Sequence, residues 1–170
     1  MPESAQQGAK LNVFISYSRD DLAFADQLDA ALKLTGFDTS IDHAIPGGDE
    51  WEKRLLTLIS DADTVVFVLS PSSAPSKWCR WEVERAKERG KRILPVLWRP
   101  LDGVDPPPEL AALQYIFFYH DPKSSPDSGW GTGLVALTAA LITDLDWLRE
   151  HTRYLQRATE WEAGHHRRRL

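Results

Sequence analysis

The chain has 170 residues, of which 42% are hydrophobic and 26% charged, a balance that supports one folded domain and argues against a disordered protein. Its 25 acidic and 20 basic side chains give a formal net charge of −5, which disfavours a general nucleic-acid-binding surface. The single cysteine excludes an intrachain disulfide framework and a multi-cysteine metal site, while composition alone leaves the seven tryptophans unexplained.

The amino-terminal part of the sequence alternates between short apolar runs and an amphipathic stretch. Residues 1–10 are small and polar, and we interpret them as a disordered leader. Residues 11–17 are rich in branched and aromatic side chains and predict a buried strand. Ser18 is placed to cap a helix that ends at Gly36. Residues 37–41 then predict the next strand.

Loops interrupt the middle of the sequence on both sides of a central strand. The loop at 42–50 contains a proline and two glycines, which preclude regular structure, and a second amphipathic helix begins at Trp51. Residues 64–69 are continuously apolar and indicate a central parallel strand covered on both faces. A further loop leads into a helix predicted at 77–88.

The carboxyl-terminal part continues the same alternation. Residues 92–98 predict a fourth strand, in which Pro95 indicates a bulge or a position near an edge. Residues 115–119 predict a fifth strand. One long helix, or two with a bend, follows from the leucine stripe Leu134, Leu137, Leu141, Leu145, Leu148 and Leu155. These five units predict an α/β fold with a parallel sheet and helices on both faces, and ligands bind beyond the carboxyl ends of such strands.

Common catalytic motifs are missing, but one acidic residue stands out. No dinucleotide-binding glycine motif, phosphate-loop lysine, hydrolase elbow or zinc-type histidine pair occurs, so no metal site is predicted. Glu82 lies at the border of the inward stripe of its helix, one turn after Trp78. Periodicity allows either a solvated glutamate on the helix flank or an acid that faces the cleft. Cys79 is interpreted as a small buried residue and not a nucleophile.

Four segments resemble a known family in the right order. They are Val-Phe-Ile-Ser-Tyr-Ser at 13–18, the Ile-Pro-Gly-Gly loop within 42–51, Ser-Lys-Trp-Cys-Arg-Trp-Glu at 76–82 and Lys-Arg-Ile-Leu-Pro-Val at 91–96. Together they resemble the Toll/interleukin-1 receptor (TIR) domain over about residues 11–140. The resemblance implies a flavodoxin-like TIR domain at 11–143. It also implies a helical connector at 144–170 that leads to a sensor or repeat region in a longer protein.

The resemblance also implies an activity. NAD-cleaving TIR domains of bacterial and axonal type carry Cys-x-x-Glu or Trp-x-x-x-Glu, and both patterns converge on Glu82 here. Nicotinamide departs as a neutral molecule, so the reaction needs no acid, and one ionised carboxylate can stabilise the positive charge that develops on the ribose. Trp78 offers a flat face for the nicotinamide ring. NAD would be the substrate, and no cofactor is required.

Five further residues are candidates for substrate binding. Ser16, Ser18 and Arg19 follow the first strand, and Arg19 suits a phosphate by charge and geometry, although an exposed surface arginine is an equal alternative. Asp42 either contacts substrate or only orders its loop. Trp51 either stacks on a substrate ring or covers the core.

Other functions remain open at this point. The main alternative is a non-catalytic module that binds other TIR domains through the 42–50 loop, and a nuclease-like nucleotide hydrolase is disfavoured by the net charge. The resemblance implies self-association and a role in bacterial antiphage defence or signalling, with nicotinamide and ADP-ribose or a cyclic ADP-ribose as products. We expect a cytoplasmic protein without a membrane partner, because no uninterrupted apolar run reaches about 18 residues.

Overall fold

A parallel sheet of five strands forms the centre of the molecule. The computed structural model describes residues 10–44, 47–121 and 128–168, with side chains described up to residue 150. The strand order is β2-β1-β3-β4-β5, and every neighbouring pair is parallel. This is the order of flavodoxin-like folds, so the predicted fold class is confirmed. The strands are β1 (Asn12–Ser16), β2 (Asp38–Ile41), β3 (Thr64–Leu69), β4 (Arg92–Leu97) and β5 (Ile116–Phe117).

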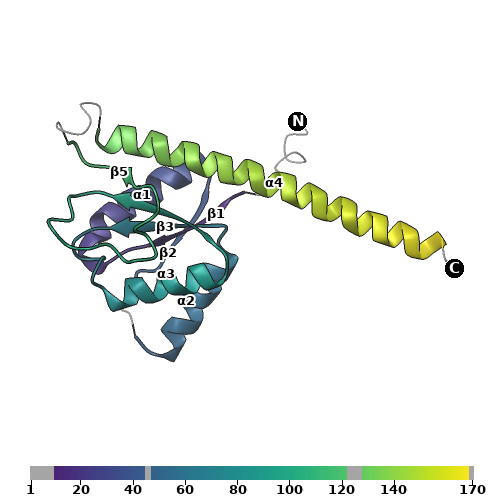
Figure 1. Ribbon diagram of the computed structural model, residues 1–170, viewed down its shortest axis with the longest axis horizontal. Helices are drawn as coiled ribbons and strands as arrows, with labels where there is room; N and C mark the ends of the chain where they lie inside the picture. Colours follow the sequence, from purple (N-terminus) through teal and green to yellow (C-terminus); the bar gives the residue numbers. More distant parts are fainter. Residues whose placement is uncertain (1–9, 45–46, 122–127, 169–170) are drawn as a thin grey trace.

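Helices cover both faces of this sheet (Figure 1). They are α1 (Leu22–Thr35), α2 (Asp49–Asp61), α3 (Lys77–Glu88) and α4 (Trp130–Arg168), with a short 3-10 turn, η2 (Arg19–Asp21), before α1. The helices α1 and α4 share one hydrophobic cluster with one side of the strands. The helices α2 and α3 pack on the other side.

The central strand β3 shows why the sequence folds this way. All six of its residues are buried. Val66 and Val68 pack in the cluster of α1 and α4, whereas Phe67 and Leu69 face the opposite cluster with residues of α3. Alternating side chains of a strand point to opposite faces, so a continuously apolar strand fits only between two layers of helices.

The last helix, α4, is continuous and runs past the domain (Figure 1). Leu137 and Leu141 of the predicted stripe are fully buried, and Leu145 and Leu148 pack partly against the same cluster. Leu155 lies outside the residues whose side chains are described. Of the two possibilities left by the sequence, the structure has one long helix without a break.

The first half of α4 has the composition of a membrane-spanning segment. Trp130–Glu150 is long and apolar enough to cross a bilayer by these criteria alone, with a mean hydropathy of 1.2. This segment contains no long uninterrupted apolar run, because small and polar residues are interspersed. Leu137 and Leu141 insert into the core of the domain, although only 17% of this segment is buried.

Candidate active site

Glu82 is buried where the strands end. Ser76 caps α3 by accepting a hydrogen bond from the Cys79 amide at 3.3 Å, which sets the rotation of the helix. Glu82 is then directed inward and is only 8% exposed, and its carboxyl group accepts a hydrogen bond from the hydroxyl of Ser16 at the end of β1. The interpretation of Glu82 as a solvated flank residue is therefore wrong.

The surroundings of Glu82 favour its neutral form. Burial raises the pKa of this carboxyl group to about 8, and the negative charge of Asp42 acts in the same direction. The hydrogen bond from Ser16 lowers the pKa but does not cancel the effect of burial. At neutral pH the carboxyl group is therefore largely protonated in this arrangement.

The neighbouring thiol has the properties expected of a packing residue. Cys79 is buried, and burial, followed by the charge of Glu82, raises its pKa to about 12. The reactive form of a cysteine is the thiolate, which is scarce at neutral pH under these conditions.

Asp42 orders the loop that follows β2. Its carboxylate accepts hydrogen bonds from the Arg54 guanidinium at 3.0 and 3.3 Å and from the Ala44 amide at 2.8 Å. Its carbonyl oxygen accepts a hydrogen bond from the Tyr17 hydroxyl at 2.7 Å. Burial also raises the pKa of Tyr17. Sequence reasoning did not single out Tyr17 or Arg54, although Tyr17 directly follows the candidate Ser16.

Three tryptophans pack together beside Glu82. Trp51 is 5% exposed, and its ring lies nearly perpendicular to that of Trp78, with 4.9 Å between centroids. Its centroid is 5.4 Å from that of Trp81. The ammonium group of Lys77 lies 4.8 Å from the ring centroid of Trp78. Trp51 thus belongs to the core cluster of α2 and α3 and also borders the candidate site.

The cavity next to Glu82 is small. It measures about 20 Å³, which is room for roughly one water molecule. Of the predicted site residues, Glu82, Arg19, Asp42 and Trp51 line it. Ser16 does not line the cavity, but its hydroxyl donates a hydrogen bond to Glu82, which does. Ser18 and Trp78 are not part of the lining.

A second carboxylate is buried in the short turn η2 that follows β1. Asp21 is 1% exposed, and it accepts hydrogen bonds from Ser70 at 2.5 Å and from the Trp98 indole at 3.0 Å. The Arg99 guanidinium lies 3.5 Å away. Ser18 lies at the N-cap position of η2, as expected from the sequence, and Asp21 lies in the first turn of η2. The Ser18 side chain makes no capping hydrogen bond, and Asp21 instead joins the ends of β3 and β4 to η2.

The described part of the chain offers no evident metal centre. Within those residues, no group of three or more histidine, cysteine, aspartate or glutamate side chains is arranged to hold an ion.

Comparisons with known proteins agree on the fold. The family described as TIR domain matches residues 13–131. The TIR domain of a Toll-related receptor from Hydra magnipapillata is similar with a TM-score of 0.60 and 20% identity, over 76% of this chain and 96% of that one. A TIR-STING receptor from C. gigas, in complex with 2',3'-cGAMP, is similar with a TM-score of 0.52 and 25% identity, over 71% of this chain and 38% of that one.

A third solved structure, of an enzyme, has a similar fold. The CMP N-glycosidase BcmB of Clostridium botulinum is similar with a TM-score of 0.51 and 18% identity, over 76% of this chain and 98% of that one. No curated protein matches the sequence.

Proposed function

The chain belongs to the TIR domain family, and from this premise we propose that it is an NAD glycohydrolase that cleaves the bond between nicotinamide and ribose. The observation that carries the proposal is the burial of Glu82 against Ser16 at the carboxyl ends of the strands, beside Trp51 and Trp78. In a parallel α/β sheet this edge is where ligands bind. Carboxyl groups with a raised pKa are concentrated at functional sites.

The chemistry requires one carboxylate. The bond between C1′ of the ribose and the pyridinium nitrogen breaks, and its electron pair neutralises the departing nicotinamide. Positive charge then develops on the ribose, and ionised Glu82 stabilises it. Water adds to C1′ and loses its proton, which gives ADP-ribose, whereas attack by the adenine ring would give a cyclic product.

The positively charged substrate supports ionisation of Glu82. A carboxyl group with a raised pKa regains its charge when a cation approaches, because the opposite charge favours the ionised form. The pyridinium of NAD supplies such a cation. Binding of substrate would therefore produce the carboxylate that the reaction uses. Exposed Arg19, at the border of the same cavity, would contact the phosphates.

Substrate entry requires the site to open. A cavity of about 20 Å³ holds no nicotinamide ring, and Trp51 fills the space beside Glu82. Opening would move Trp51 and the loop held by the Asp42–Arg54 pair. We propose that association with other TIR domains drives this step. We also propose a cytoplasmic role in bacterial antiphage defence or signalling, with a sensor region beyond the connector at 144–170.

Glu82→Gln tests the proposal directly. We expect the variant to lose at least 100-fold in nicotinamide release, because removal of one electrostatic stabiliser of a transition state costs about that much. The measurement is chromatography of nicotinamide from NAD at high protein concentration with a crowding agent. Glu84→Gln is the matched control on the same helix, since Glu84 is 41% exposed and pairs only with surface arginines.

Two outcomes would contradict the proposal. Absence of nicotinamide release by the assembled wild type would favour the scaffold alternative. Full activity of Glu82→Gln with an unchanged circular dichroism spectrum would remove the role assigned to Glu82.

A further inference from the structure

The carboxylate of Asp21 uses both of its oxygen atoms in hydrogen bonds. Oδ2 accepts a hydrogen bond from the Ser70 hydroxyl at 2.5 Å, and Oδ1 accepts one from the Trp98 indole at 3.0 Å. Ser70 directly follows β3 and Trp98 directly follows β4, so Asp21 joins three segments at the carboxyl ends of the strands. Asp21 and Ser70 are almost completely buried, so these bonds are the ones that satisfy their polar atoms.

The hydrogen-bond pattern requires a carboxylate at position 21. The Ser70 hydroxyl already accepts hydrogen bonds from the amides of Ser72 and Ser73, each at 3.1 Å. A hydroxyl has two acceptor sites and one donor, so only its donor remains for Asp21. The Trp98 indole can only donate. Both partners therefore need an acceptor. An asparagine side chain offers one oxygen and one NH₂ group and cannot satisfy both.

The bond from Asp21 to Ser70 continues into the start of α3. The Ser70 amide donates to the Ser73 hydroxyl at 2.9 Å, and the Ser76 amide donates to the Ser73 carbonyl at 3.1 Å. Ser76 then caps the first turn of α3. The loop between β3 and α3 is thus held at its beginning by Asp21, and its end sets the position of the helix that carries Glu82.

Asp21 is also close in the chain to the hydrogen-bond partner of Glu82. Ser16, whose hydroxyl donates to Glu82, ends β1, and Asp21 lies in the turn η2 that follows this strand. We propose that Asp21 is a positioning residue for Glu82: by holding Ser70, it fixes the start of α3 against the end of β1 and keeps Glu82 within reach of Ser16. Its effect on catalysis rests on the proposed cleavage of NAD, whereas its effect on the position of Glu82 does not.

Asp21→Asn tests the proposal with a side chain of nearly the same size. The pKa of Glu82 is about 8, chiefly because the carboxyl group is buried. Release of the loop would let α3 move away from β1 and let water reach Glu82, so we expect this pKa to fall to roughly 7 or lower. Carbon-13 NMR of protein with labelled glutamate measures the pKa without substrate. The signal of Glu82 is assigned by its absence from Glu82→Gln.

A double substitution separates positioning from a general loss of stability. We expect Asp21→Asn to reduce nicotinamide release by the assembled protein at least roughly tenfold, because misplacement of a reacting group by about 1 Å can cost about 100-fold. In the Glu82→Gln background, Asp21→Asn should cause no further loss. Effects that act through one residue are not additive, whereas a general loss of folded protein would reduce the rate in both backgrounds.

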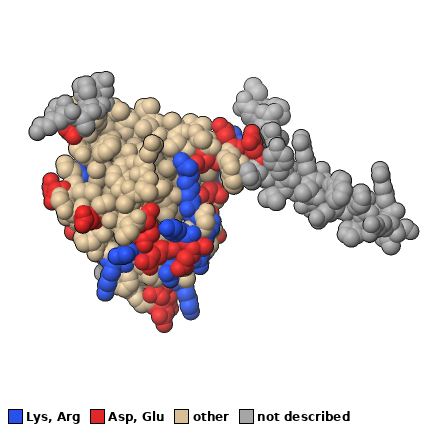
Figure 2. All heavy atoms as spheres, in the orientation of Figure 1, with Lys and Arg blue, Asp and Glu red and all other residues tan. Residues whose placement is uncertain are grey.

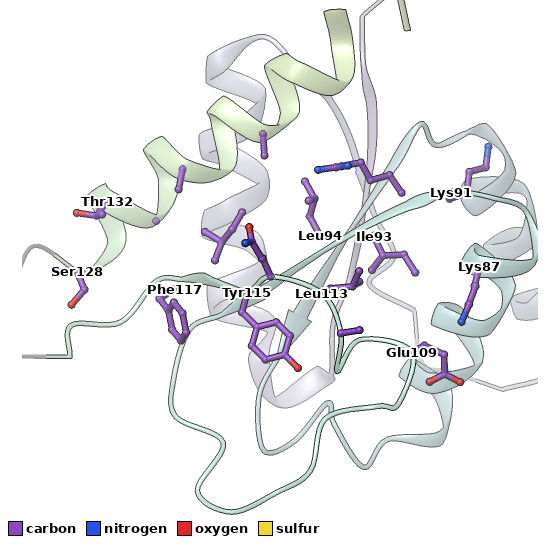
Figure 3. Close-up of a pocket in the computed structure, with 17 residues that line it drawn as sticks. Lys87, Lys91, Ile93, Leu94, Glu109, Leu113, Tyr115, Phe117, Ser128 and Thr132 are labelled. Carbon is purple, nitrogen blue, oxygen red and sulfur yellow. The ribbon is translucent and has the colours of Figure 1, made fainter. Parts of the chain in front are cut away.

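Two single variants complete the design. Ser70→Ala removes the hydroxyl that Asp21 holds, so it should lower the pKa of Glu82 and the rate in the same way, and it carries the test if Asp21→Asn does not fold. Gly133→Ala is the control for stability. Gly133 lines a separate cavity of about 890 Å³ beside β4, β5 and α4 (Figure 3), which shares no lining residue with the cavity at Glu82. Its substitution should leave the pKa of Glu82 and the rate per folded molecule unchanged.

Three results would overturn the proposal. The first is a pKa of Glu82 that stays near 8 in Asp21→Asn and Ser70→Ala. The second is a further loss of activity when Asp21→Asn is added to Glu82→Gln. The third is an equal change of the Glu82 pKa in Gly133→Ala, which would assign the effect to stability alone. If the wild type releases no nicotinamide, the proposed function fails, and the NMR titration still decides the role of Asp21.

Discussion

Burial of the Glu82 carboxyl group couples the stability of the domain to pH. Its pKa is about 8 in the folded chain and near the ordinary value of 4.5 when unfolded. Between these values the folded state binds one proton more than the unfolded state, so stability falls as pH rises. Glu82→Gln removes this proton. We expect the melting temperature of the variant, relative to wild type, to rise between pH 5 and pH 8.5.

Thermal unfolding followed by circular dichroism across this pH range measures the effect. Glu84→Gln should track the wild type, because Glu84 is a surface residue. If the melting temperatures of wild type and Glu82→Gln changed with pH in the same way, the pKa of Glu82 would be the same in the folded and unfolded chain. That result would contradict the raised pKa of the buried carboxyl group.

Single residues of the site were only partly predictable from the sequence. The spacing of α3 placed Glu82 at the border of the buried stripe, where periodicity cannot decide exposure. In the folded chain, Glu82 is buried and bonded to Ser16, which lies 66 positions away in the sequence. Trp98 and Asp21 form a contact across 77 positions, which no local pattern reveals. Such long-range pairs depend on strand order, which becomes visible only in the folded sheet.

Two glycines near the start of α4, Gly131 and Gly133, differ in how closely the helix packs against β5. A Cβ atom at Gly133 would lie 2.6 Å from the backbone oxygen of Phe117 and 2.8 Å from the Phe118 ring, so α4 would be pushed away from β5. We expect Gly133→Ala to destabilise the domain by about 1–3 kcal/mol. Gly131 has nothing within 4 Å of such an atom, and Gly131→Ala should stabilise by about 0.5–1 kcal/mol.

Urea unfolding of the two variants decides this comparison. Both substitutions add the same methyl group two residues apart in one helix, so helix propensity cancels between them. Equal stability of the two variants would mean that α4 does not approach β5 as closely as described.

The sequence predicts a strand most accurately where helices cover both faces of the sheet, because every residue of that strand must then be apolar. The run at 64–69 matches β3 at both ends, because burial on both faces requires every side chain to be apolar. The fifth strand was expected at 115–119 but forms only at Ile116–Phe117. It lies at the edge of the sheet, where Phe117 is 46% exposed, and apolar character there does not report pairing. Pro95, for which the sequence left a bulge or a position near an edge, lies in β4, the strand next to the edge strand β5.

At the scale of the whole molecule, α4 continues past the sheet without a break. On the face shown in Figure 2, most charged side chains lie in the lower and right-hand part of the domain, whereas the surface near the start of α4 is largely uncharged. The sequence placed the end of the domain at residue 143. Packing continues beyond that point, because Asp144 accepts a hydrogen bond from buried Thr64 at 2.9 Å and pairs with Arg92. Leu145 and Leu148 then add apolar contacts.

Two shortened chains locate the boundary of the folded unit. A chain that ends at residue 150 keeps all of these contacts, and Figure 1 shows the later part of α4 projecting away from the sheet. Its melting temperature should match that of the full chain. A chain that ends at residue 143 leaves the Thr64 hydroxyl unpaired and exposes apolar surface, which should cost about 2–4 kcal/mol. Asp144→Ala in the longer chain isolates the polar contact, and it should account for only part of this loss. Equal stability of the two shortened chains would place the boundary at residue 143.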